Sequence, residues 1–296
     1  MTKAASTPDP NPNTIVRMPS WVTLARAETP EDVVFLSGAA LATLHLVAAS
    51  KDIPHALWRA RLALLSAEAC AGFSGRREGA TGLRDALHLT RLGDHPGPAG
   101  AVFGQWSRAV ARPISVAALG KAIDRVSAER IALCLDARGS NPVDRAAGVL
   151  EAVLADTPRA ETAALILADA VLAKSMDKEH ILPLMSLGLK PRDLRLRGDA
   201  LRQACHRAVV AGAGQAVPLA ADLARRAARL RAVVPKLRAK GAARAVERFL
   251  SQDALAPTAL AGIMSDRAAR RFCDRLVDLG VLRELTGRDS FRLYGV

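Results

Sequence analysis

Apolar residues recur every three or four positions along most of this chain, the spacing of one face of an α-helix. Alternation of apolar and polar residues, which marks a strand, lasts only a few residues at a time before Val281. The pattern predicts an all-α, multi-helical body. Its helices are expected over about residues 30–50, 54–73, 81–92, 99–111, 115–135, 142–156, 159–174, 193–211 and 216–233.

The first of these helices has clear start signals: Thr29 as a capping hydroxyl, then Pro30, Glu31 and Asp32 in the first turn. The uncharged run Val33–Ser50 is long enough to be weighed as a membrane span. It contains Ser37, Gly38, Thr43, His45 and many alanines, so we expect a buried core helix and no membrane contact.

Residues 1–20 contain four prolines among polar residues and predict a flexible leader. They lack the apolar core of a signal peptide. Residues 21–234 are then interpreted as one multi-helical domain. The segment 235–241, Pro-Lys-Leu-Arg-Ala-Lys-Gly, is read as a basic linker that is either a solvated hinge or a phosphate-contacting arm.

Residues 242–296 predict a separate module. Short helices are expected over about Ala242–Ser251 and from Pro257 to near Ile263. A third runs from Ser265 as N-cap to Leu279, with Gly280 as the terminating glycine. The β-prone runs Val281–Leu285 and Ser290–Tyr294 form a hairpin around the turn 286–289. Three helices followed by a hairpin is the order of a winged helix-turn-helix.

The third helix of this module predicts a DNA-contacting face. Its apolar residues gather on one side, and Arg267, Arg270 and Arg271 project from the other, near the N-terminus, where recognition helices approach base edges. Arg288 and Arg292 in the hairpin are placed to reach phosphates or the minor groove. The alternatives are that Arg270 and Arg271 form ordinary surface pairs with Asp274, or that the module binds a protein.

The charge of the chain is unevenly distributed. The formal net charge is +13, and residues 192–296 carry 21 Lys/Arg against 10 Asp/Glu. Such a basic half suggests a polyanionic partner, since phosphate contacts release counterions. An arginine-rich coding bias is the competing explanation. Aromatic residues make up only 3%, which argues against single-strand binding by base stacking.

The sequence contains none of the Gly-x-x-x-x-Gly-Lys-Ser/Thr, His-Glu-x-x-His or Gly-x-Ser-x-Gly motifs. Four cysteines, at positions 70, 134, 205 and 273, are too far apart for zinc-ligand or redox spacing, so we expect buried, reduced thiols in a cytoplasmic protein. The six histidines have no acid or nucleophile at helix spacing that forces a catalytic role. We therefore expect no cofactor and no metal.

Several stretches resemble known families. The C-terminal runs Ser265–Arg271, Asp274–Val277, Leu279–Gly280, Arg283–Arg288 and Phe291–Gly295 are similar to the winged helix of bacterial Fic-type and related proteins. From about Trp21 to Val296 the chain resembles a bacterial family of domains of unknown function, number 1403. That resemblance rests on Gly75–Glu78 with Leu83–Ala86, Gly93–Asp94 with Pro96–Gly100, and Pro235–Gly241.

Ser74–Gly79 also matches the inhibitory Ser/Thr-x-x-x-Glu-Gly pattern of Fic adenylyl-transferases, and His95-Pro96 is similar to the start of their catalytic loop. Gly97–Gly100, however, lacks the acid, asparagine and arginine of that loop. The main expectation is a non-enzymatic regulator or mobile-element maintenance factor that binds duplex DNA. The alternatives are a protein-interaction adaptor and a degenerate Fic-like relative. Oligomeric state is left open.

Overall fold

The computed structural model describes residues 15–24, 27–76, 78–90, 94–288 and 290–296. Over these residues the protein is mostly helical, with one pair of two-residue strands near the C-terminus, so the predicted all-α class is confirmed. Most of the predicted leader, residues 1–14, lies outside the described residues. Residues 15–19 have no regular structure, and the first helix begins at Ser20.

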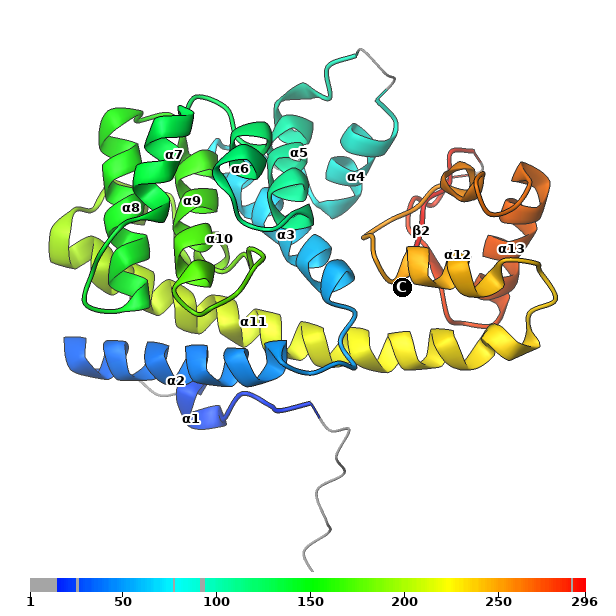
Figure 1. Ribbon diagram of the computed structural model, residues 1–296, viewed down its shortest axis with the longest axis horizontal. Coiled ribbons are helices and arrows are strands. Elements are labelled where there is room, and N and C mark those ends of the chain that lie inside the picture. The colour runs from blue at the N-terminus through cyan, green and yellow to red at the C-terminus, as the bar shows by residue number, and fades with distance from the viewer. Residues whose placement is uncertain (1–14, 25–26, 77, 91–93, 289) are drawn as a thin grey trace, which may run out of the picture.

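The body is a cluster of helices packed around α9, Glu161–Lys174 (Figure 1). Every residue from Ala163 to Ala173 in this helix is buried, because other helices cover it on all sides. The others are α3 (His55–Phe73), α4 (Ala80–His88), α5 (Gly97–Ala111), α6 (Val116–Ala122), α7 (Ala128–Leu135), α8 (Pro142–Asp156) and α10 (Met185–Gly188).

Two of the predicted helices form a single continuous helix in the structure. The sequence predicts separate helices over 193–211 and 216–233, but the structure has a single helix α11, Gly198–Val233, with Pro218 inside it and a short 3₁₀ turn η1 (Asp193–Arg195) before it. Pro218 removes one backbone donor, yet the helix is packed on both sides of that point. At Gly212 the backbone lies so close to the Leu184 carbonyl that a Cβ would stand 2.6 Å from its oxygen. Tertiary packing thus overrides the local break signal.

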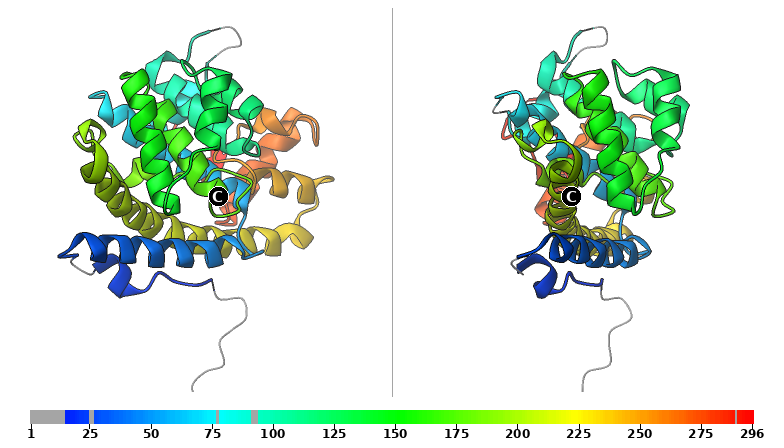
Figure 2. Two further views of the ribbon diagram at one scale, coloured as in Figure 1. Left: turned by 60° about the vertical axis from the view of Figure 1, so that its left-hand side comes forward. Right: turned by 90° about the vertical axis from the view of Figure 1, so that its left-hand side faces the viewer.

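Helix α2, Pro30–Ala48, lies along α11 (Figures 1 and 2). The predicted cap is present, because Thr29 accepts a hydrogen bond from the Asp32 N–H and Asp32 accepts one from the Thr29 N–H. By length and composition this helix could cross a membrane, but 44% of its most apolar window is buried within the protein. Its outer face is exposed: Phe35 is 66% exposed and stacks on Trp21 of α1 (Ser20–Leu24). The prediction of a buried helix therefore holds for one face.

The C-terminal module, residues 242–296, follows α11 and the 3₁₀ turn η2 (Val234–Lys236). It contains α12 (Ala242–Phe249), the 3₁₀ helix η3 (Pro257–Leu260) where the second short helix was predicted, and α13 (Asp266–Asp278). Gly280, with φ +67°, follows α13 as predicted. The N–H groups of Gly280 and Val281 donate to the carbonyls of Val277 and Leu276, which closes the helix end.

The predicted hairpin is present but shorter. Strand β1 (Arg283–Glu284) pairs antiparallel with β2 (Tyr294–Gly295), with Glu284 opposite Tyr294. On its other side Tyr294 exchanges two backbone hydrogen bonds with Leu255, which precedes η3. The module is therefore tied together by three short extended segments as well as by its helices.

Candidate nucleic-acid interface

The module is joined to the body by a buried carboxylate. Asp253, in the loop between α12 and η3, accepts two hydrogen bonds from Arg84 of α4, at 2.7 and 3.0 Å. Arg61 of α3 approaches the same carboxylate, with 2.9 Å between its Nε and Oδ1, and donates from Nη2 to the Val296 carbonyl at 3.0 Å. Asp253 is only 6% exposed, so two cations surround it in a medium that screens them poorly. This contact fixes the module against α3 and α4.

Two further ion pairs cross the same boundary. Arg231 near the end of α11 donates to both carboxylate oxygens of Glu247 on α12, at 3.0 and 3.3 Å. Arg288 in the hairpin pairs with Asp85 of α4. The core is also continuous, since buried residues of the body and of the module form one cluster. The module is thus docked, and the predicted linker joins two packed parts.

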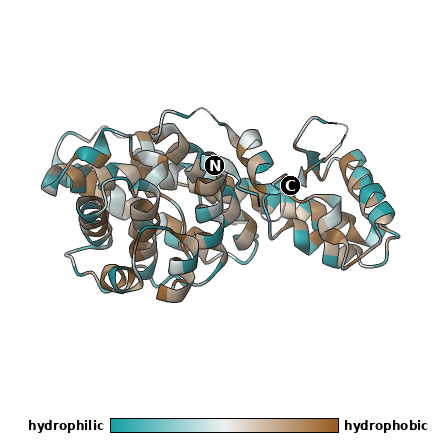
Figure 3. Cartoon of the chain, turned by 90° about the horizontal axis from the view of Figure 1, so that it is seen from above, coloured by the Kyte–Doolittle hydropathy of each residue, from teal (hydrophilic) through white to brown (hydrophobic). Residues whose placement is uncertain are grey.

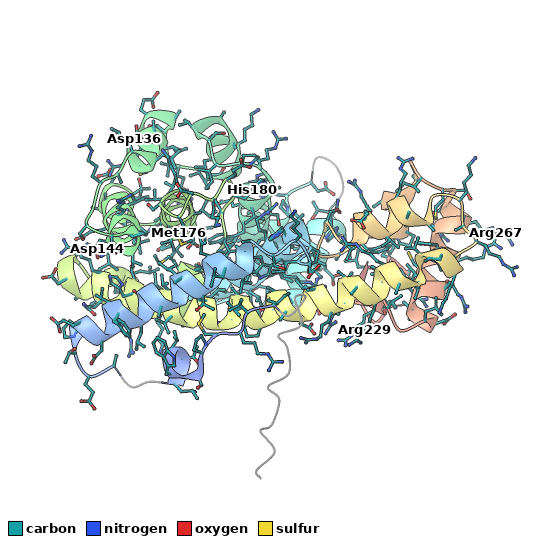
Figure 4. The ribbon with its side chains drawn as sticks, turned by 60° about the horizontal axis from the view of Figure 1, so that its bottom comes forward. Asp136, Asp144, Met176, His180, Arg229 and Arg267 are labelled. Carbon is teal, nitrogen blue, oxygen red and sulfur yellow. The ribbon has the colours of Figure 1, made fainter. Side chains whose placement is uncertain are left out.

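The α13 arginines lie where the sequence placed them. Arg267, Arg270 and Arg271 are all exposed, while Phe272 and Cys273 are buried on the opposite side. Arg270 pairs with Asp266 at 2.7 Å. In Figure 4, Arg267 lies at the end of the molecule farthest from Asp144 of the body. Hydrophilic residues dominate this outer helix in Figure 3.

Arg275 belongs to the same surface, although sequence reasoning did not select it. Arg267, Arg271 and Arg275 follow one another at four-residue steps, so they form one exposed stripe along α13. None of these three makes an ion pair with another residue in the described part of the chain. The helical spacing alone was the signal that could have added Arg275.

The acid between the arginines has another partner. Asp274 was considered as a surface partner of Arg270 and Arg271, but its Oδ1 accepts a hydrogen bond from the Tyr294 hydroxyl at 3.1 Å. Tyr294 lies in β2, so this bond holds the hairpin against α13. Burial raises the pKa of Tyr294, which keeps its proton available for this bond.

The two hairpin arginines are placed differently from the α13 stripe. Arg292 is exposed and its Nε donates to the Arg288 carbonyl at 2.9 Å. The Arg288 side chain turns toward the body and pairs with Asp85, so it is partly occupied rather than projecting from a free tip. Asp289 of the predicted turn lies outside the described residues. Arg292 lies beside the Tyr294 hydroxyl, which in turn bonds to Asp274 of α13. Arg288 lies instead against Asp85 of α4.

A groove of about 700 Å³ lies on the surface of the C-terminal module. It lies between α12 and the turn after η3, and its lining includes Arg244, Arg248 and Ile263. Arg244 and Arg248 are exposed and, within the described residues, unpaired with any acid. Gly262 and Ile263 in its wall belong to the turn that ends, after Met264, at the N-cap Ser265 of α13.

A buried Ser–His–Asp contact is a second arrangement that the sequence did not reveal. The Ser37 Oγ of α2 lies 2.5 Å from Nδ1 of His206 on α11, and its Nε2 lies 3.3 Å from Oδ1 of Asp144 on α8. Burial lowers the pKa of His206, and Asp144 opposes this. Ser37 is 1% exposed and also donates to the Val34 carbonyl, so its hydroxyl has no access to a substrate. We interpret the contact as a tie between three helices.

The cysteines are buried and free, as predicted. Burial raises the pKa of Cys70, Cys205 and Cys273 to about 12. These thiols therefore carry little thiolate at neutral pH. In the described parts of the chain, no three or more His, Cys, Asp or Glu side chains come together in a group that could hold a metal ion.

These features define an all-α protein with a docked, arginine-rich C-terminal module. The chain belongs to the family described as "Protein of unknown function (DUF1403)", whose sequence model matches residues 7–296. This confirms the resemblance to family number 1403 over almost the whole chain. No curated protein and no solved structure gives a match.

Proposed function

We propose that this protein is a non-enzymatic, cytoplasmic DNA-binding protein whose C-terminal module is a winged helix-turn-helix. The order of α12, the Leu255 bridge, η3, α13 and the β1–β2 hairpin supports this fold. In such a module the third helix enters the major groove and the hairpin contacts the backbone. Here α13 takes the first role.

The observation that carries the proposal is the stripe of Arg267, Arg271 and Arg275. Three exposed guanidinium groups on one helix face, without acid partners among the described residues, create a local field that favours phosphate and the acceptor edges of guanine. Arg244 and Arg248 extend the basic surface along the adjoining groove. The excess of 21 Lys/Arg over 10 Asp/Glu in residues 192–296 supplies the longer-range attraction.

We expect the arginines to contribute unequally to duplex affinity. Arg270 already has Asp266, and Arg288 already has Asp85, so both must exchange an ion pair for a DNA contact. Arg267, Arg271 and Arg275 need no such exchange. We therefore assign the larger share of duplex affinity to this stripe, with Arg292 as the hairpin contact.

The test is fluorescence anisotropy of labelled mixed-sequence duplexes and genomic fragments with the full-length protein. The variant Arg267→Ala/Arg271→Ala/Arg275→Ala removes the stripe. The control Arg112→Ala/Arg138→Ala/Arg159→Ala removes the same charge from exposed arginines of the body. We expect the stripe variant to lose at least about tenfold in affinity, and its log affinity to fall less steeply with log salt, by about 0.9 per lost phosphate contact. Equal losses of affinity in both variants would show that binding depends only on net charge and not on the stripe. A folded wild type without salt-sensitive binding would refute the proposal.

A further inference from the structure

A cavity of about 340 Å³ lies where the module meets the body. Its walls come from α3, α4 and α5 and from the module segment Ser251–Ala254. Small-molecule sites typically begin at about 300 Å³ and favour the boundaries between structural units. This cavity has both the size and the location of a ligand site.

The lining combines apolar and polar groups. Ala60, Leu87 and Phe103 provide an apolar wall. Ser107 of α5 and Gln252 of the module add a hydroxyl and an amide that can donate hydrogen bonds. An apolar wall with a few convergent polar groups suits a small organic molecule better than a hydrated inorganic ion.

The charged group of the cavity is Arg59. Its Nε donates to the Val110 carbonyl at 3.2 Å, which fixes the guanidinium plane, while its terminal nitrogens have no hydrogen bond or ion pair to a residue of the described chain. Partial burial lowers the pKa of Arg59, so the charged form already bears a desolvation cost. Arg59 interacts electrostatically with His55 and His180, and neither histidine supplies a negative charge; Lys178 acts on His55 and Glu179 on His180.

The acid in the same wall is already neutralised. Asp253 lines the cavity, but its carboxylate is already paired with Arg84 and Arg61. His88 also lines the cavity, and burial lowers its pKa. The cavity thus contains a fixed, half-buried guanidinium with open donors and no free counter-charge.

We propose that this cavity binds a small organic carboxylate, whose carboxylate pairs with Arg59 and whose apolar part packs on Leu87 and Phe103. A guanidinium and a carboxylate can form two parallel hydrogen bonds, the strongest pairing open to Arg59. Gln252 belongs to the module and Arg59 to the body, so a bound molecule bridges the two. Such a ligand stabilises the docked arrangement by mass action. The proposal does not depend on DNA binding and is tested without DNA.

The experiment uses phenylacetate as the probe and phenylacetamide as its uncharged analogue of the same shape, with hexanoate as a second carboxylate. Binding to the full chain is measured by calorimetry and by the shift in Tm. We expect both carboxylates to bind and to raise the Tm, with the amide at least about tenfold weaker because it cannot pair with a guanidinium.

Two variants and one matched control locate the site. Arg59→Gln removes the charge, and Ala60→Leu fills the apolar part; each is expected to weaken phenylacetate at least about tenfold while circular dichroism shows an unchanged fold. Arg108→Gln is the control, since Arg108 also donates to a backbone carbonyl, that of Ala122, but does not line the cavity. The proposal is overturned if neither carboxylate binds, if phenylacetamide binds equally well, or if both folded variants bind phenylacetate like Arg108→Gln.

Discussion

Arg84 of α4 donates two hydrogen bonds to the carboxylate of Asp253, which belongs to the C-terminal module 169 residues away. Both side chains are buried, and Arg61 approaches the same carboxylate. This shared anion makes the module part of the body's structure.

Asp253→Asn is expected to destabilise the protein strongly. It removes the negative charge that two buried arginines share, and breaking a buried ion pair on one side costs about 3–5 kcal/mol. Urea unfolding measures the loss. Asp266→Asn is the control, because Asp266 pairs with Arg270 in an exposed position, where such pairs contribute about 0.5 kcal/mol or less. Similar losses in both variants would contradict the role assigned to Asp253.

Asp85→Asn is expected to increase duplex affinity modestly, by about twofold to fivefold. The substitution removes the acid that holds Arg288, so the guanidinium becomes available to a phosphate. Asp156→Asn changes the net charge equally by releasing Arg130 in the body. Anisotropy titrations at one fixed salt concentration compare the two. If both substitutions raise affinity by the same factor, Arg288 does not contact the duplex.

Asp169→Asn is expected to change how stability depends on pH. Burial raises the pKa of Asp169 to about 7, against opposing hydrogen bonds from the N–H groups of Leu184 and Met185. The folded protein therefore binds a proton more tightly than the unfolded chain. The stabilisation that this tighter proton binding gives the folded protein is fully present below the ordinary carboxyl pKa of 3.8 and is lost as pH rises to about 7.

The measurement is urea unfolding of the wild type and Asp169→Asn from about pH 4 to pH 8. The free energy of unfolding of the wild type minus that of the variant should fall by on the order of 4 kcal/mol across that range and then level off. All other ionisable groups are common to both proteins, so their effect cancels in the difference. A difference that stays constant with pH would show that Asp169 titrates near its ordinary value.

The sequence predicted much of the fold because helix periodicity and end signals are local. The Thr29 cap, the Gly280 end of α13 and the exposed face of α13 all depend on residues within a few positions of one another. The continuous helix through Pro218 was missed because its stability comes from packing against distant residues such as Leu184.

The candidate site was predictable only where it depends on residues close together in the sequence. The arginines of α13 follow from helix spacing, whereas the attachment of Arg288 to Asp85 joins residues 203 positions apart. The Ser37–His206 contact spans 169 positions, and the Arg59 cavity combines three body helices with a module loop. A single sequence carries no local signal for such contacts.

The central claim, that α13 lies against the duplex, is tested most directly by site-specific cross-linking. The four native thiols are buried, so a single exposed cysteine introduced by Arg271→Cys can be modified selectively with a photo-activated cross-linker. Arg138→Cys gives the matched probe on the body. The account predicts DNA adducts from position 271, competed by unlabelled duplex, and few from position 138. Equal cross-linking from both positions, or none from position 271 under conditions where the protein binds DNA, would contradict it.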